Sequence, residues 1–228
     1  EIGCSLAQSA ETLGYGAYLS TTAKQPKSLH VVYINTSLRT KAQSQRLVPT
    51  ITCTSSNVVR TILQAAAQEP EISIWFGPDT YMGANLEVMF QNMSEMSEAQ
   101  VRELHPGHTP KSIAALLSRF HYYGQGNCVV HHLFGAQVVA QVREDYQDAQ
   151  VTAHLEVPGE MFELALEGQR AGRGVVGSTS NILRYIEARV EASIEANRGG
   201  TERFVLGTEA GMVSAIVRAV ADKLRAAG

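Results

Sequence analysis

The sequence predicts an α/β protein built from repeated, parallel αβα units, and three observations support this. Short runs rich in β-branched residues alternate with longer amphipathic segments, as in a chain of βαβ units. The predicted strands are nearly apolar throughout, which is typical of a sheet with both faces covered. One strand–helix motif also occurs twice along the chain, which indicates a duplicated unit.

The alternation assigns elements along most of the chain. Strands are predicted at residues 30–34, 72–76, 128–130, 150–154, 174–176 and 203–206, and helices at 57–68, 86–93, 134–142, 161–169, 181–196 and 212–225. Residues 93–121 break the rhythm because they are polar with a helical pattern, so we predict a peripheral insertion there. Its histidines are expected to be solvated loop residues rather than metal ligands.

The repeat is visible in three separated stretches. Residues 54–62 align with 178–186 at an offset of 124, residues 32–35 align with 153–156 at 121, and residues 76–79 align with 206–209 at 130. Offsets that change slowly along the chain indicate a duplication followed by changes in loop length.

Composition excludes several classes of protein. Hydrophobic residues make up 44% of the 228 residues, charged residues 18%, and the formal net charge is −3. This balance is typical of a globular protein and gives no electrostatic reason to expect a nucleic-acid partner. No apolar run reaches the roughly 18 to 20 residues that a membrane-spanning helix needs.

Polar side chains follow corresponding strands in the two copies. Tyr33 and Asn35 end one strand, and His154 and Glu156 end its counterpart. Ligands of parallel α/β sheets bind beyond the carboxyl ends of the strands. Together these side chains supply a hydroxyl, an amide, a base and a carboxylate, so we predict a site for a small molecule there.

The start of the repeated helix carries hydroxyl groups in both copies. Ser55 and Thr179 occupy matching positions, where unpaired N–H groups and the helix dipole favour an anion. Ordinary N-capping is the alternative, because Ser and Thr are preferred caps. The presence of the same arrangement in both copies favours a shared ligand site.

The cysteines also fit the repeat. Cys4 and Cys128 are 124 residues apart, which equals the offset of the helix-start motif, whereas Gly177 corresponds to Cys53. If the unit occurs three times around a pseudo-threefold axis, each copy would supply one such cysteine. Three cysteines can hold a [4Fe–4S] cluster and leave one iron open as a Lewis acid. We therefore predict Cys4 and Cys128 as cluster ligands and Cys53 as a packed thiol.

Six separated motifs resemble the quinolinate synthase family, in its longer plant and algal form. They are VYINTS (32–37), CTSSN (53–57), CVVH (128–131), HLE (154–156), VGST (176–179) and GTE (207–209). The likeness extends over essentially the whole chain. It departs from the family in HLE, where the family has HPE, and in the missing third cysteine and most of the first domain.

The resemblance implies an enzyme that condenses iminoaspartate with dihydroxyacetone phosphate, releasing phosphate and water, to form quinolinate for NAD biosynthesis. It implies a [4Fe–4S] cluster, with a third cysteine ligand outside this chain. Glu156, His154 and Tyr33 would act in catalysis. The residues that would bind substrate are Asn35, Ser55, His131 and Thr179.

Together, the repeat and the resemblance imply an internal fragment, inactive by itself. Residues 1–28 would be the end of the first αβα domain, residues 29–148 the second with its insertion at 93–121, and residues 149–228 the third, truncated before its cysteine. The resemblance further implies a plastid stroma location, with the cytoplasm as the alternative. L-aspartate oxidase, iron–sulfur assembly proteins and a second copy in a homodimer are the expected protein partners.

Two other functions stay open at this level. Diphthamide-synthesis enzymes also place three cysteines around an iron–sulfur cluster, although the Tyr-x-Asn and His-x-Glu pairs favour a small substrate. A non-catalytic module that binds a phosphorylated or dicarboxylic metabolite would explain the helix starts without any cluster.

Overall fold

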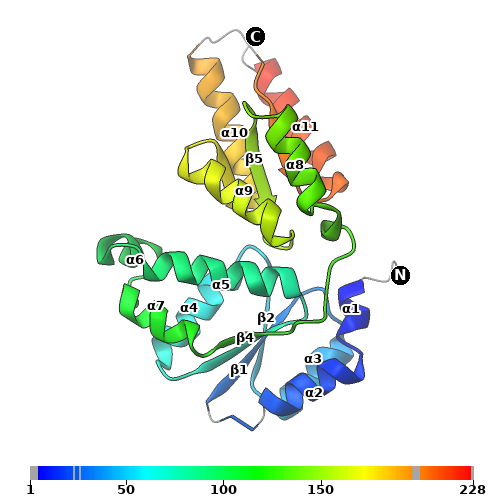
Figure 1. Ribbon diagram of the computed structural model, residues 1–228, viewed down its shortest axis with the longest axis vertical. Coiled ribbons are helices and arrows are strands. Elements are labelled where there is room, and N and C mark those ends of the chain that lie inside the picture. The colour runs from blue at the N-terminus through cyan, green and yellow to red at the C-terminus, as the bar shows by residue number, and fades with distance from the viewer. Residues whose placement is uncertain (1–4, 23, 26, 197–200, 227–228) are drawn as a thin grey trace. The chain divides into compact units, whose positions relative to one another are not determined.

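The computed structural model describes residues 5–22, 24–25, 27–196 and 201–226, so Cys4 lies outside the described residues. The chain divides into two compact units, Glu1–Cys128 and Val129–Gly228. Each unit is a parallel sheet with α-helices packed against it (Figure 1). The predicted α/β class is therefore confirmed.

The sheet of the first unit has the strand order β2-β1-β3-β4, and every pair is parallel. Its strands are β1 (Ser28–Tyr33), β2 (Thr50–Cys53), β3 (Ser73–Gly77) and β4 (Phe120–Tyr122). Helices α2 and α3 lie on one side of this sheet, and α4, α5 and α7 lie on the other (Figure 1). Right-handed βαβ crossovers in this strand order put α3 on one side and α4, α5 and α7 on the other.

The helices of the first unit include a long element that the sequence predicts only in part. Their bounds are α1 (Ser5–Ser9), α2 (Leu13–Thr22), α3 (Leu38–Leu47), α4 (Val58–Gln68), α5 (Thr80–Ser94), α6 (Glu98–Leu104) and α7 (Pro110–Leu117). Asp79 caps α5, because its Oδ1 accepts the N–H of Met82 at 2.7 Å. The helix therefore begins six residues before the predicted segment 86–93.

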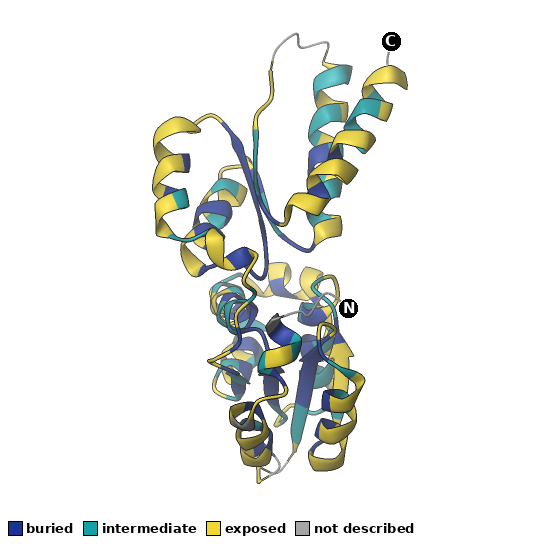
Figure 2. Cartoon of the chain, turned by 90° about the vertical axis from the view of Figure 1, so that its right-hand side faces the viewer, coloured by how far each residue is buried: buried dark blue, intermediate teal, exposed yellow. Residues whose placement is uncertain are grey.

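The second unit has a three-stranded sheet in the order β6-β5-β7, again fully parallel. Its elements are the short 3₁₀-helix η1 (His131–Leu133), α8 (Ala136–Asp145), β5 (Gln150–His154), α9 (Gly159–Arg170), β6 (Gly174–Gly177), α10 (Thr179–Glu195), β7 (Phe204–Gly207) and α11 (Ala210–Ala226). Every residue of the central strand β5 is buried, as expected when helices cover both faces (Figure 2).

The two sheets share both strand order and register. β1 lies between β2 and β3, as β5 lies between β6 and β7. The matching residue pairs are Tyr33–Cys53 and Val32–Gly77 in the first sheet, and His154–Gly177 and Ala153–Gly207 in the second. The positions that align in the sequence repeat thus occupy equivalent places in the two sheets.

The strand predicted at 128–130 is wrong. Residues 129 and 130 form a turn that leads into η1, and both valine side chains are exposed. A run of three apolar residues is too short to define a strand by itself.

Strands β2 and β4 and helices α1, α2 and α3 have no counterpart among the predicted elements. β2 is an edge strand with two exposed residues, which weakens the apolar pattern.

The prediction of solvated histidines at 105–108 is also wrong. His105 and His108 are buried. Nε2 of His108 lies 2.7 Å from the carbonyl oxygen of Leu63, and Nε2 of His105 lies 3.3 Å from Oε1 of Gln64. The two imidazoles therefore fasten the loop after α6 to helix α4. Both histidines stand in a polar stretch of the sequence, which gives no sign that they are buried.

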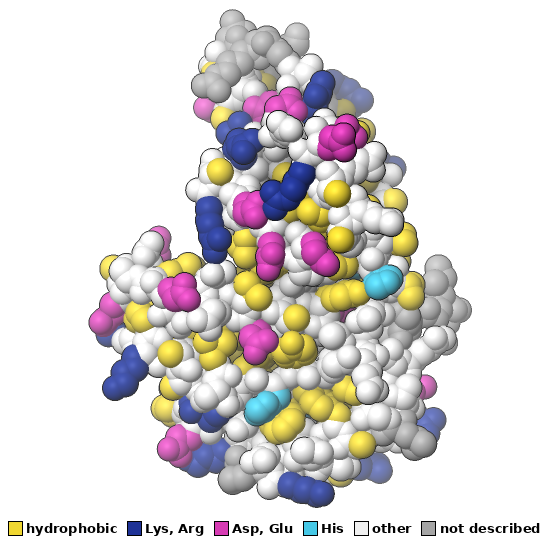
Figure 3. Space-filling model, in the orientation of Figure 1, with side chains coloured by type: hydrophobic (Ala, Val, Ile, Leu, Met, Phe, Trp, Pro, Cys, Tyr) yellow, Lys and Arg dark blue, Asp and Glu magenta, His cyan; other side chains and the backbone are white. Residues whose placement is uncertain are grey.

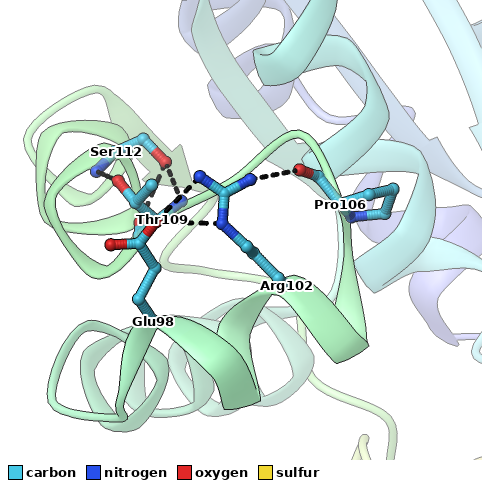
Figure 4. A network of polar contacts seen from close by, with 5 residues as sticks. All are labelled: Glu98, Arg102, Pro106, Thr109 and Ser112. Carbon is cyan, nitrogen blue, oxygen red and sulfur yellow. Dashed lines mark hydrogen bonds and ion pairs between the residues drawn. The ribbon is translucent and has the colours of Figure 1, made fainter.

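The same loop is braced from its other side (Figure 4). Arg102 donates to Oε1 of Glu98 at 2.8 Å and to the carbonyl oxygen of Pro106 at 3.3 Å. Thr109 and Ser112 form a capping box at the start of α7. The segment is thus a structured connection from α5 to β4, and its helical pattern is confirmed.

Ion pairs on the surface contribute little to the stability of the fold. Basic and acidic side chains are interspersed on the face drawn in Figure 3, and ion pairs such as Arg143–Glu167 are solvent-exposed. Exposed pairs contribute at most about 1 kcal/mol each. Within the described part of the chain, no helix combines the length and apolar character needed to cross a membrane.

A buried polar chain links α2 to the first sheet. The hydroxyl of Tyr15 lies 2.8 Å from Nε2 of His30, and Nδ1 of His30 lies 3.4 Å from Oγ1 of Thr50. Thr50 donates its own proton to the carbonyl oxygen of Val48 at 2.9 Å, so its oxygen accepts from Nδ1. His30 therefore carries its proton on Nδ1 and accepts from Tyr15 on Nε2.

We expect His30 to make the first unit less stable in acid. Burial lowers the pKa of His30 from 6.5 to about 3, so below pH 6.5 the unfolded chain binds a proton that the folded chain excludes. The contribution of neutral, buried His30 to the free energy of unfolding is complete above pH 6.5 and is lost as the pH falls toward 3. Between pH 7.5 and pH 5 the loss from this group should be about 2 kcal/mol.

Urea denaturation of His30→Gln, followed by fluorescence of the single tryptophan Trp75, measures the effect. Glutamine can still accept from Tyr15 but does not titrate. Its unfolding free energy should therefore fall less with acid than that of the unchanged chain. Equal pH dependence in the two proteins would contradict the assignment.

Candidate functional site

Three ionisable side chains meet at the carboxyl end of β5: the His–Glu cluster of His131, His154 and Glu156. Oε2 of Glu156 lies 3.3 Å from Nδ1 of His131 and 3.2 Å from Nδ1 of His154. The two imidazole rings are stacked, with centroids 5.2 Å apart and planes 10° apart. All three residues are buried.

Local backbone structure positions this cluster. His154 is the last residue of β5, and the turn after it brings Glu156 back, so that the Glu156 N–H donates to Nδ1 of His154 at 3.4 Å. His131 begins η1, in the connection before α8. The cluster therefore combines a strand end with a short helical turn, within a single unit of the chain.

The backbone contact decides the tautomer of His154. Because Nδ1 accepts the N–H of Glu156, neutral His154 carries its proton on Nε2. Oε2 of Glu156 lies 3.2 Å from the same nitrogen, so the carboxylate and its own backbone N–H both contact Nδ1 of His154.

Burial lowers the pKa of His131 from its usual value. Glu156 raises this pKa, His154 lowers it, and Glu209 raises it, but burial is the largest of these effects. A neutral imidazole beside a carboxylate at neutral pH is a suitable proton acceptor. The arrangement can therefore receive and return protons.

The three residues also form a group of His and Glu side chains whose ligand atoms lie within 4.8 Å of one another. A metal ion bound by imidazole lies near the ring plane, on the lone pair of the nitrogen. The two ring planes are 10° apart, and both Nδ1 atoms lie within 3.3 Å of Oε2 of Glu156. The three side chains could therefore hold a metal ion or exchange protons.

The other predicted site residues lie at the same edge of their sheets. Tyr33 is the buried last residue of β1, and exposed Asn35 follows it. Ser55 lies in the turn after β2, and Thr179 is the first residue of α10, directly after β6. Of the predicted residues, contacts within one unit join His131, His154 and Glu156.

The helix starts differ from the simplest expectation, because Ser55 and Thr179 are not the caps. Ser178 caps α10 and exchanges hydrogen bonds with Asn181 in a capping box. In the first unit Oδ1 of Asn57 accepts the N–H of Thr54 at 2.7 Å. Ser178 therefore caps α10, whereas Asn57 occupies the N-cap position of α4 without a capping hydrogen bond from its side chain. The hydroxyls of Ser55 and Thr179 are not used as caps.

The cysteines differ in exposure. Cys53 is buried, and burial raises the pKa of its thiol to about 12. This burial agrees with the prediction of Cys53 as a packed thiol. Cys128 is partly exposed and closes the first unit.

Glu209 is a charged neighbour of the cluster that was absent from the predicted site residues. It raises the pKa of His131 from the turn between β7 and α11. The alignment of 206–209 with 76–79 gave the available signal, because it places a carboxylate after corresponding strands in both copies.

Comparison with known proteins identifies close relatives. Residues 1–226 match the family model described as quinolinate synthetase A protein. The chain is 56% identical over 226 residues to a chloroplastic quinolinate synthase of Nicotiana tabacum, covering 99% of this chain and 31% of that protein. It is 54% identical over 222 residues to the chloroplastic enzyme of Oryza sativa subsp. japonica, covering 97% of this chain and 31% of that protein.

A more distant relative has the same family name. The quinolinate synthase of Cyanothece sp. is 27% identical over 224 residues, which cover 98% of this chain and 52% of that protein. The chain thus spans about a third of the length of the plant relatives and about half of this one.

The substitution Glu156→Gln should lower the pKa of His131 further. It removes the negative charge that raises this pKa, while burial still opposes protonation. NMR titration of the His131 ring resonances measures the change. Glu160→Gln, an exposed change in the first turn of α9, is the matched control and should leave the pKa unaltered. An unchanged or raised pKa in Glu156→Gln would contradict the cluster geometry.

Proposed function

Because this chain belongs to the quinolinate synthetase A family, we propose that it supplies part of the active site of a quinolinate synthase. In the whole protein, iminoaspartate and dihydroxyacetone phosphate condense to quinolinate, with loss of phosphate and water. The family match favours this activity over a diphthamide-type enzyme and over a non-catalytic module. The buried His–Glu cluster is the observation that carries the proposal.

The cluster suits the chemistry of this condensation. Formation of the ring requires protons to leave carbon and nitrogen, and each elimination requires a proton to reach a departing oxygen. Glu156 accepts and returns these protons, and neutral His131 serves as the base beside it. His154 presents Nε2–H as a donor to a substrate oxygen, since its Nδ1 faces the Glu156 backbone.

The chain offers binding sites for the anionic groups of the substrates. Ser55 and Thr179 stand beside the starts of α4 and α10, where N–H groups and the helix dipole favour a carboxylate or phosphate. Tyr33 and Asn35, at the carboxyl end of β1, add a hydroxyl and an amide for the same substrates. These roles agree with the position of ligand sites in parallel α/β folds.

A [4Fe–4S] cluster completes the proposal. Cys128 would be one ligand, since its thiol is partly exposed, and Cys4 would be a second; the third would lie outside this chain. When bound, the cluster supplies a Lewis acid that polarises a hydroxyl or carbonyl of the substrate. The sequence repeat that pairs Cys4 with Cys128 supports three domains around a pseudo-threefold axis.

The proposal extends to the setting of the enzyme. The names of the plant relatives include "chloroplastic", so we place the whole protein in the plastid stroma. L-aspartate oxidase would deliver the unstable iminoaspartate, and iron–sulfur assembly proteins would load the cluster. A homodimer is the proposed assembly.

Substitution of Glu156 tests the proposed proton transfers. In the whole protein, Glu156→Gln should lower the rate of quinolinate formation by about 100-fold or more, because the amide cannot accept a proton. Quinolinate is measured chromatographically after incubation with both substrates under anaerobic conditions. Glu160→Gln should retain full activity. Activity of Glu156→Gln within threefold of the unchanged enzyme would exclude a proton-transfer role.

The cysteine assignment has its own test. Anaerobic reconstitution of the whole protein with iron and sulfide should give a brown protein. Its visible absorption should be lost in Cys128→Ala. Cys53→Ala should keep the cluster, because that thiol is buried and protonated. A reconstituted Cys128→Ala protein with full cluster absorption, or loss of the cluster only in Cys53→Ala, would reverse the assignment.

A further inference from the structure

Four aromatic rings of the first unit form a contiguous aromatic cluster: Tyr15, Tyr18, Trp75 and Tyr123. The ring centroids lie 5.7 Å apart for Tyr15 and Tyr18, and 5.6 Å apart for Tyr18 and Trp75. Tyr123 packs edge-on against Tyr15 at 4.9 Å. Side chains from α2, from β3 and from the segment after β4 therefore meet in one cluster.

Such rings are the protein side chains that one-electron oxidants attack most readily. At these separations an electron vacancy can pass from ring to ring. Tyr18 is partly exposed and Tyr15 is fully buried, so the cluster leads from the surface into the core.

The rings differ in what their polar hydrogens meet. Tyr18 donates to the carbonyl oxygen of Phe76 at 2.8 Å, and Nε1 of Trp75 donates to the Ser28 hydroxyl at 3.2 Å. The Tyr123 hydroxyl donates to Oε1 of Gln125 at 3.4 Å. None of these three acceptors is as strong a base as an imidazole. Tyr15 instead donates to Nε2 of His30, whose Nδ1–H is held by Thr50.

An oxidised phenol is a strong acid, so its proton passes to a hydrogen-bonded base within reach. His30 is neutral in the folded chain and offers a lone pair 2.8 Å from the Tyr15 oxygen. Of the four rings, Tyr15 can therefore lose an electron and keep its proton close by. That combination gives a long-lived radical that can be reduced again.

We propose that Tyr15 is a redox-active tyrosine, which donates one electron to a one-electron oxidant through the aromatic cluster while its proton moves to His30. The O–H bond of Tyr15 breaks and an N–H bond forms at Nε2 of His30. The oxidant gains the electron, leaving a neutral tyrosyl radical beside an imidazolium. Reduction returns the proton to oxygen. This inference is independent of the proposed function.

The test uses the whole protein with photogenerated tris(bipyridine)ruthenium(III) as the oxidant, followed by electron paramagnetic resonance. The unchanged protein should show a persistent tyrosyl radical whose high-field g tensor indicates a strong hydrogen bond. Tyr15→Phe should lose this signal. Tyr146→Phe, an exposed tyrosine of the second unit, is the control and should keep it.

His30→Gln separates proton transfer from packing, because glutamine accepts the hydrogen bond but not the proton. Formation of the Tyr15 radical should slow by about 100-fold and lose its dependence on deuterated solvent. Three results would each overturn the proposal: a persistent signal unchanged in Tyr15→Phe, radical kinetics unchanged in His30→Gln, or a g tensor without a hydrogen bond in the unchanged protein. The last two measurements decide the matter even if Tyr15→Phe fails to fold.

Discussion

The carboxylate of Glu156 is buried, and a buried carboxylate needs protons or donors close to it. In this chain Nδ1 of His131, 3.3 Å from Oε2 of Glu156, can donate to that oxygen, and Nδ1 of His154 lies 3.2 Å from it. The requirement dictates much of the second unit. β5 has to end at His154, the turn after it has to bring Glu156 back, and η1 has to deliver His131 from the preceding connection. The chemistry proposed for the protein uses the same three side chains.

The placement of that carboxylate depends in turn on the parallel sheet. β5 is the central strand of its sheet, and all its residues are buried. β6 and β7 end beside it and bring the start of α10 and the turn carrying Glu209 to the same edge. The first unit repeats this order and register around β1. A duplicated fold thus provides two similar edges, and divergence of the side chains gives each its own polar groups.

Histidine serves three different purposes in this chain, and burial alone does not distinguish them. His30 accepts a hydrogen bond from the Tyr15 hydroxyl and donates one to Thr50. His105 and His108 hold a loop against a helix through hydrogen bonds. His131 faces a carboxylate, which opposes the effect of burial on its pKa. The presence of an adjacent carboxylate is what separates the candidate catalytic residue from the structural ones.

The sequence by itself determined the α/β class, the duplicated unit and the identity of the polar residues that follow β1 and β5. Periodicity and repetition are properties of neighbouring residues, so they are legible without a structure. Only the tertiary structure decided that His131 meets Glu156, that His105 and His108 are buried, and that residues after Cys128 form a turn instead of a strand. Those facts depend on contacts between residues such as Leu63 and His108, which lie far apart in the chain, and on burial that local composition does not encode. The Tyr15–His30 pair belongs to the same class, because it forms only when α2 packs against β1.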